Sequence, residues 1–191
     1  DVVSVGEVKE AMDAGFKAND IVFSGVAKTV SEIEFAVEAG VSQINVESPM
    51  ELERIAEVAK RLGKKAPVAF RMNPDVNADT HPYICTGFRD NKFGMDESFL
   101  PELERILKAS PDNLDLKGVT LHIGSQIKDL SSILEAIKKT IPTYAYLQSQ
   151  GYGLTTFDVG GGLGISYEED GAGPDYEMIS EYGKKVTELL A

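Results

Sequence analysis

The sequence contains one complete strand-and-helix unit in the run Gln43-Ile44-Asn45-Val46-Glu47-Ser48-Pro49-Met50-Glu51, which continues to Leu62-Gly63. The apolar residues at its start predict a short buried strand. Ser48 and Glu51 have the spacing of a capping box, and Pro49 stands at the first helical position, where its missing N–H costs nothing. Gly63 is placed to end the helix as a left-handed C-cap. The apolar residues between these caps recur at helical spacing and form one face of the predicted helix; they are Leu52, Ile55, Ala56 and Ala59.

The same pattern of an apolar run, a capping Ser or Thr, and a helix ending at glycine is repeated on the N-terminal side, in residues 2–15 and 21–40. Further strands are predicted at 67–72, 116–122 and 155–159, and further helices at 98–109, 130–149 and 175–190. This makes six βα units in alternation, with strands too apolar to have a wet face. Such alternation predicts a parallel sheet covered by helices.

Periodicity does not separate an open doubly wound sheet from a β/α barrel. The barrel is favoured because polar residues and a glycine follow the strands at their C-terminal ends, as in barrel active sites; they are Ser24, Glu47, Arg71, Asn73, His122, Ser125 and Gly160. Six strands cannot close an eight-stranded barrel, so either the sheet is open or two strands are missing. We therefore predict an α/β fold, a partial (β/α)8 TIM-type barrel, with residues 1–191 as one incomplete barrel domain.

Composition excludes several classes of function. The 191 residues carry a net charge of -12, with a sequence pI near 4.6, and so acidic a surface repels nucleic acid. The sequence has no apolar run of roughly 18 residues, the length needed to span a membrane. Cys85 is the single cysteine, and no Cys/His cluster indicates a metal site.

Two features concern the limits and the connections of the chain. It begins at Asp1, without Met and within a predicted strand, so we expect a piece of a longer protein. The connection from Pro74 to Glu97 is longer than the usual limit of roughly 12–15 residues, and such loops are usually functional or disordered. We interpret it as an active-site loop because of its anchoring side chains, which are His81, Tyr83, Arg89, Lys92 and Phe93.

The strongest local motif is Phe157-Asp158-Val159-Gly160-Gly161-Gly162-Leu163-Gly164. Successive glycines after a strand let backbone amides approach an anion closely. The run fits neither the dinucleotide-binding pattern, since Ile165 stands where a glycine is needed, nor the Walker pattern. It predicts a compact phosphate cradle, with a tight turn as the alternative.

Three side chains outside the glycine run have the chemistry of a site. His122, at a strand end, could stack on a flat cofactor or transfer a proton, or it could be a satisfied core histidine. Ser125 could bind the same anion as the glycines. Arg71 emerges from a buried strand, where a guanidinium faces a carboxylate or a phosphate. For Lys28 we expect a solvated loop lysine rather than a lysine bound to a cofactor.

These motifs, taken in order, resemble the diaminopimelate decarboxylase family, within the ornithine decarboxylase and alanine racemase group of pyridoxal 5'-phosphate (PLP) enzymes. The matching segments extend over nearly the whole chain; they are Asp1–Ser4 with Glu7, Ile21–Gly25, Asn45–Ser48, Arg71–Asp75, His81–Gly94, His122–Gln126 and Asp158–Gly164.

The resemblance implies a β/α barrel followed by a β domain, and homodimers with active sites at the subunit interface. It implies that His122 stacks on the pyridine ring, and that Ser125 and the amides of Gly160, Gly161 and Gly162 bind the phosphate. It also places Asp1, Glu7 and Arg71 in the polar cluster around the cofactor lysine, and His81, Tyr83 and Lys92 in a loop that borders the substrate entrance.

The implied activity is decarboxylation of meso-diaminopimelate to L-lysine by a cytoplasmic enzyme. The family's cofactor lysine would lie upstream of Asp1, and its Glu-Pro-Gly-Arg segment and C-terminal β domain are also absent, so we expect residues 1–191 alone to be inactive. The alternatives are a related decarboxylase of ornithine, arginine or carboxynorspermidine, and a non-catalytic PLP-binding barrel protein.

Overall fold

The computed structural model describes residues 1–76, 93–166 and 173–191. Its main sheet has five parallel strands in the order β1-β2-β3-β4-β5. They are β1 (Val22–Phe23), β2 (Gln43–Val46), β3 (Ala66–Arg71), β4 (Leu114–Thr120) and β5 (Thr156–Asp158). Each strand pairs with the next strand in the sequence. A doubly wound sheet would reverse its order at a switch point, so the unbroken order confirms the predicted partial barrel.

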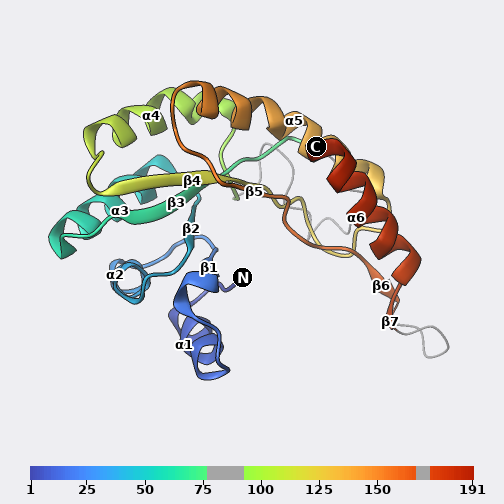
Figure 1. Ribbon diagram of the computed structural model, residues 1–191, viewed down its shortest axis with the longest axis horizontal. Helices are drawn as coiled ribbons and strands as arrows, with labels where there is room; N and C mark the ends of the chain where they lie inside the picture. Colours follow the sequence, from blue (N-terminus) through green and yellow to red (C-terminus); the bar gives the residue numbers. More distant parts are fainter. Residues whose placement is uncertain (77–92, 167–172) are drawn as a thin grey trace.

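The helices form an arc outside this curled sheet, from α1 and α2 through α3, α4 and α5 to α6 (Figure 1). Their bounds are α1 (Val5–Asp13), α2 (Val30–Ala39), α3 (Pro49–Leu62), α4 (Leu100–Ala109), α5 (Leu130–Ser149) and α6 (Tyr176–Leu190), with 3-10 turns at η1 (Ala18–Asp20) and η2 (Glu97–Phe99). These bounds agree closely with the predicted helices, although α4 has no side-chain cap and α1 has Ala14 rather than Gly15 as its C-cap.

Two predictions about strands were wrong. The first predicted strand, at Val2–Ser4, is an isolated parallel bridge from Val2 to Phe23, because Ser4 already caps α1. The sheet therefore has five strands, with Val2 alone in a sixth position. The antiparallel pair β6 (Ile165–Ser166) and β7 (Gly173–Pro174) was not predicted, because two-residue strands are too short to give a pattern.

The three predicted capping boxes form in two ways. Thr29 and Glu32 make the complete reciprocal box of α2. In α1 and α3 the serine caps as expected, but the glutamate binds the amide one residue further back: Glu7 accepts from Val3 N at 2.7 Å, and Glu51 accepts from Glu47 N at 2.7 Å. The second contact fixes the carboxylate of Glu51 beneath the end of β2.

The core is divided into two apolar clusters. The larger one fills the space between β1–β4 and helices α1–α4, with Phe23, Ile44 and Phe70 fully buried at its centre. The second joins the segment that follows β4 to α5 and α6. Although α6 has no fully buried residue, it packs on this cluster through partly buried side chains, namely Met178, Tyr182, Val186 and Leu189.

Gly118 provides a test of the packing between β4 and β5. A Cβ at Gly118 would lie 1.8 Å from the carbonyl oxygen of Thr156, so Gly118→Ala must push the two strands apart. We expect it to lower the free energy of unfolding by about 2 kcal/mol or more, measured by urea titration. Gly153→Ala is the matched control because a Cβ there would have no atom within 4 Å. Equal stability of the two variants would contradict this packing.

Candidate functional site

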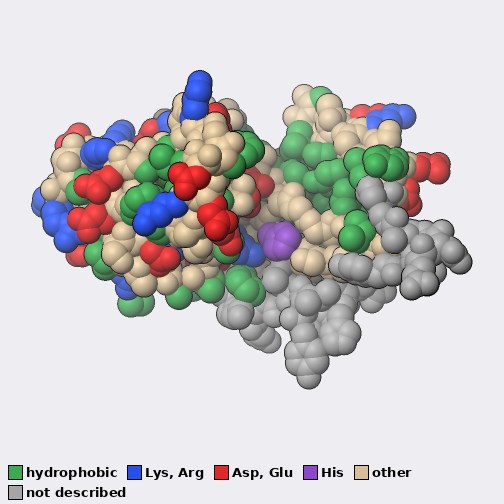
Figure 2. Space-filling model, turned by 90° about the horizontal axis from the view of Figure 1, so that it is seen from below, with side chains coloured by type: hydrophobic (Ala, Val, Ile, Leu, Met, Phe, Trp, Pro, Cys, Tyr) green, Lys and Arg blue, Asp and Glu red, His purple; other side chains and the backbone are tan. Residues whose placement is uncertain are grey.

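A cavity of about 420 Å³ lies at the C-terminal edge of the sheet, where β1, β3, β4 and β5 end. It is lined by five of the residues that the sequence predicted, which are Asp1, Arg71, His122, Gly160 and Gly161. The described residues contain one histidine, and Figure 2 shows it in purple in a hollow between two raised parts of the surface. The parallel strands thus bring together residues that lie more than 150 positions apart, as the barrel prediction requires.

One wall of the cavity is a chain of polar side chains across the ends of β1 and β2. Ser24 donates to Asp1 Oδ1 at 2.7 Å, and Asn45 Nδ2 donates to Ser24 Oγ at 2.8 Å. Gln43 Nε2 in turn donates to Asn45 Oδ1 at 2.7 Å. This chain continues the inward-facing side of β2 and fixes the carboxylate of Asp1 at the cavity wall.

Arg71 forms a second wall at the end of β3. Its Nη1 donates to Glu47 Oε1 at 2.7 Å, and its Cζ lies 4.9 Å from the centre of the Phe93 ring. The other oxygen of Glu47 accepts from Gly94 N at 2.9 Å. The prediction that Arg71 faces a carboxylate is therefore confirmed, and that carboxylate belongs to Glu47.

The glycine loop after β5 is held by Asp158. Its Oδ2 accepts from Thr120 Oγ1 and its Oδ1 accepts from Gly160 N, both at 2.8 Å. Asp158 thereby joins the end of β4 to the turn at Gly160, whose φ of 69° is in the left-handed region. This contact engages the Gly160 amide, and the loop continues with the amides of Gly161 and Gly162.

The loop packs too closely on the segment after β4 for side chains to fit. A Cβ at Gly160 would lie 2.3 Å from Leu121 O, and one at Gly162 would lie 1.9 Å from Gly124 O. The same Cβ at Gly162 would be 3.3 Å from Ser125 Cα, so Ser125 adjoins the loop without lining the cavity. Backbone amides and a hydroxyl in this arrangement can bind a phosphate.

His122 links the cavity to this loop. Gly161 N donates to His122 Nδ1 at 3.5 Å, so this ring nitrogen is the acceptor of a long hydrogen bond. Burial lowers the pKa of His122 from its ordinary value, and the positive charge of Arg71 lowers it further, against the opposing effects of Asp158 and Glu47. A neutral, flat imidazole is suited to stack on an aromatic cofactor.

The prediction for Lys28 was wrong. Lys28 is only 3% exposed, and its Nζ donates to the carbonyl oxygens of Gly25 and Asn45, both at 2.6 Å. It also forms an ion pair with Glu51 at 3.3 Å. Burial lowers the pKa of Lys28 and raises the pKa of Glu51. The partners Asn45 and Glu51 lie in β2 and α3, 17 and 23 residues further along the sequence, so the local sequence does not indicate that Lys28 is buried.

The remaining predicted residues lie elsewhere. Glu7, Ser125 and Gly162 do not line the cavity, and Glu7 instead caps α1 through Val3 N. The loop residues His81, Tyr83 and Lys92, together with Arg89 and Cys85, lie outside the described residues. The site also contains lining residues that were not predicted as ligands, and their signal is a polar residue in a buried strand or just after one: Ser24, Asn45, Thr120 and Asp158.

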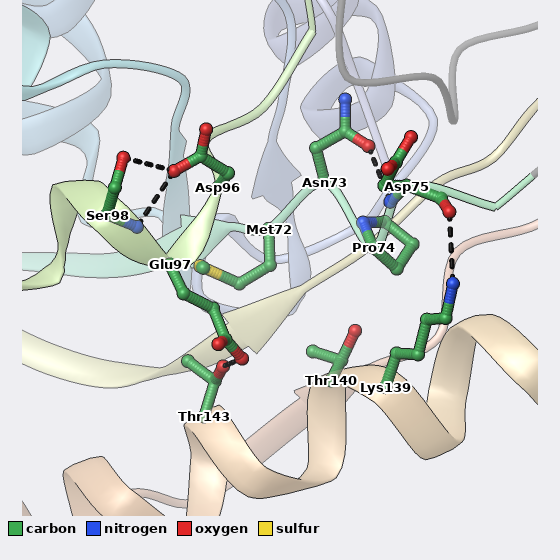
Figure 3. A pocket seen from close by; sticks show the side chains of 10 residues that line it. All are labelled: Met72, Asn73, Pro74, Asp75, Asp96, Glu97, Ser98, Lys139, Thr140 and Thr143. Carbon is green, nitrogen blue, oxygen red and sulfur yellow. Dashed lines mark hydrogen bonds between the residues drawn. The ribbon is translucent and has the colours of Figure 1, made fainter.

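A larger cavity, of about 490 Å³, lies outside this site, between the end of β3, η2 and α5. Figure 3 shows a hydrogen bond from Thr143 to Glu97, and another from Lys139 to the carbonyl oxygen of Asp75. Of the predicted residues this cavity is lined by Asn73 and by both ends of the Pro74–Glu97 connection, but it contains neither His122 nor Arg71 nor the glycine loop. Within the described ranges, no cluster of His, Cys, Asp and Glu is arranged to hold a metal, and none of the helices combines the length and the apolar character needed to span a membrane.

Comparison with known proteins places this arrangement in a family. Residues 1–191 match the family described as "Pyridoxal-dependent decarboxylase, pyridoxal binding domain". The chain belongs to this family.

Three of its relatives are diaminopimelate decarboxylases. The chain is 45% identical over 187 residues to diaminopimelate decarboxylase of Zymomonas mobilis, covering 97% of this chain and 44% of that protein. It is 44% identical over 190 residues to the enzyme of Neisseria meningitidis, covering 100% and 45%. The crystal structure of the Helicobacter pylori enzyme with L-lysine matches with a TM-score of 0.90 and 42% identity, covering 98% and 46%.

This pyridoxal-dependent decarboxylase chain spans a little under half the length of the curated relatives it matches. The family's cofactor fits the cavity found here. The cavity's volume of about 420 Å³ is within the range of small-molecule sites. The loop next to His122 forms a cradle of backbone atoms, and a Cβ at Gly160 or Gly162 would fill the space of that cradle.

The glycine loop can be tested by adding a methyl group at two adjacent positions. Gly162→Ala should lower the affinity for PLP by about ten-fold or more, because its Cβ must displace the loop from Gly124 O. Gly161→Ala, which meets no atom within 4 Å, is the control and should change the affinity much less. Fluorescence titration measures both. Equal losses would show that the close packing does not shape the cradle.

The pKa of His122 provides a pH test. Because its folded pKa is lowered, the unfolded chain takes up the proton first, near pH 6.5, so the stability contributed by neutral His122 is present above that pH. It is lost as the pH falls toward the folded pKa. An NMR titration of the His122 ring should give a midpoint below 6.5, with His122→Gln used for assignment. A midpoint above 6.5 would contradict the assigned environment.

Proposed function

We propose that residues 1–191 are the incomplete PLP-binding barrel domain of an enzyme that decarboxylates meso-diaminopimelate to L-lysine. The observation that carries the proposal is the cavity in which His122, Arg71 and the glycine loop meet, in a chain 44–45% identical to diaminopimelate decarboxylases. The name shared by these relatives favours diaminopimelate over ornithine, arginine or carboxynorspermidine.

The residues have distinct roles in this proposal. The amides of Gly161 and Gly162, with the Ser125 hydroxyl, would hold the phosphate by local hydrogen bonds, which explains how so acidic a chain can bind an anion. His122 would support one face of the pyridine ring. The hydrogen bond from Gly161 N to His122 Nδ1 would hold the imidazole ring beside the glycine loop that binds the phosphate.

PLP, when bound, accepts the electron pair that remains when the carboxylate leaves the substrate. The chain's own contribution is orientation and charge. Arg71 brings a positive charge to the cavity wall and would attract a carboxylate or phosphate group, while Asp1 and Asp158 line the same cavity with negative charge. The fixed hydrogen bonds of all three side chains mean that no large rearrangement is needed when the ligand enters.

The described residues provide no covalent anchor for the cofactor. Among the described residues no lysine lines the cavity, and the Nζ of Lys28 is engaged by two carbonyl oxygens and Glu51. We further propose a cytoplasmic homodimer for the whole enzyme, with a free amino acid as its substrate.

The proposal predicts the specificity of the full-length protein. With PLP it should release carbon dioxide and L-lysine in equal amounts from meso-diaminopimelate, with a kcat/KM at least about 100-fold above that for L-ornithine, L-arginine or carboxynorspermidine. Coupled carbon dioxide release and product chromatography measure this. A preference for another amine would identify a different decarboxylase, and saturable PLP binding without carbon dioxide release would identify a non-catalytic barrel protein.

A further inference from the structure

Glu47 contacts two parts of the cavity wall at once. It follows β2, and its side chain is only 5% exposed. One carboxylate oxygen accepts from Arg71 Nη1 at 2.7 Å, and the other accepts from Gly94 N at 2.9 Å. A buried carboxylate is costly unless each oxygen is paired, and here both are.

Glu47 is itself held by a second buried ion pair. Its backbone N–H donates to Glu51 Oε2 at 2.7 Å, while Glu51 Oε1 pairs with Lys28 Nζ. Lys28 also binds the carbonyl oxygens of Gly25 and Asn45, two residues that line the cavity. The four buried side chains Lys28, Glu51, Glu47 and Arg71 carry two positive and two negative charges, so the group is neutral overall.

This network restricts the guanidinium in two directions. Glu47 fixes Nη1, and the ring of Phe93 lies against the group, 4.9 Å from Cζ. Because a guanidinium is planar, these two contacts also set the directions of its remaining N–H donors. Without Glu47, the long Arg71 side chain would recover rotamer freedom and lose its charge partner.

We propose that Glu47 is a positioning residue, which holds Arg71 in the orientation that binds the anionic group of the ligand in this cavity. The Lys28–Glu51 pair supports it from beneath β2. This inference rests on the proposed function, because that function supplies the anion. The anion is either the phosphate of PLP or the carboxylate of the amino-acid substrate. The inference assigns to Glu47 a role that acts through Arg71 and requires no contact with the ligand.

The first test measures the position of Arg71 directly, in the full-length protein without PLP. Phenylglyoxal modifies accessible arginines, and peptide mass spectrometry gives the rate at each one. In Glu47→Gln, Arg71 should react about ten-fold faster or more, because a charge-assisted hydrogen bond is lost. Glu53→Gln is the matched control: it breaks the exposed Glu53–Arg105 pair on α3 and should leave the rate at Arg71 unchanged.

The second test measures whether Glu47 acts through Arg71. On the wild-type background, Glu47→Gln should weaken PLP binding or raise the KM for meso-diaminopimelate by about ten-fold. On an Arg71→Met background the same change should have little further effect. A loss seen with PLP but not with pyridoxal assigns the phosphate as the anion, and a change in KM alone assigns the substrate carboxylate.

The outcomes separate this inference from the proposed function. Unchanged reactivity of Arg71, or additive effects in the double variant, would overturn the role of Glu47 even if the enzyme is a diaminopimelate decarboxylase. If Glu47→Gln does not fold, Glu47→Asp keeps the charge and should recover part of the protection of Arg71; no protection in this variant would also overturn it. Failure of the wild-type protein to bind PLP would instead refute the proposed function, whatever the reactivity of Arg71.

Discussion

Sequential parallel pairing is the constraint from which the site follows. When each strand pairs with the next one in the chain, all strand ends meet at one edge, and the sheet must curl as the helices pack outside it. Arg71, His122 and Gly160 share a cavity for this reason, although each belongs to the end of a different strand, and Asp1 joins them through its hydrogen bond with Ser24 after β1. The larger cavity beside α5 begins at the residues that follow β3 and is lined by Asn73 and Asp75, but it contains neither His122 nor the glycine loop.

Two kinds of contact then give the cavity its chemistry. The backbone at Gly160 and Gly162 packs so closely on its neighbours that no side chain fits there, and backbone amides line the loop instead. Asp158 fixes the turn by accepting a hydrogen bond from the Gly160 amide. The second kind of contact is the buried charge pair. Glu47 orients Arg71, and the positive charge of Arg71 helps to keep His122 neutral. The overall charge of -12 has little bearing on a site built from such short-range contacts.

Local signals in the sequence predict most of the fold. Helix α3 begins at Pro49 and ends before Gly63 as the capping residues indicate. The alternation of strands and helices predicts a parallel sheet covered by helices, and the polar residues at the strand ends favour a partial barrel over an open doubly wound sheet. The glycine run and the residues at strand ends identify one edge of the sheet as the site. The buried state of Lys28 and the pairing of Glu47 with Arg71 could not be predicted in this way, because each depends on partners 17 to 24 residues away that only the folded sheet brings close. Val2 forms a bridge rather than a strand because Ser4 caps the helix that follows.

A crystal structure of the full-length protein with PLP would show whether the cavity at the strand ends binds the cofactor. We expect the pyridine ring against His122 and the phosphate at the amides of Gly161 and Gly162, with Arg71 still paired to Glu47. Density for PLP in the cavity between β3 and α5, or a phosphate bound away from the glycine loop, would contradict this expectation.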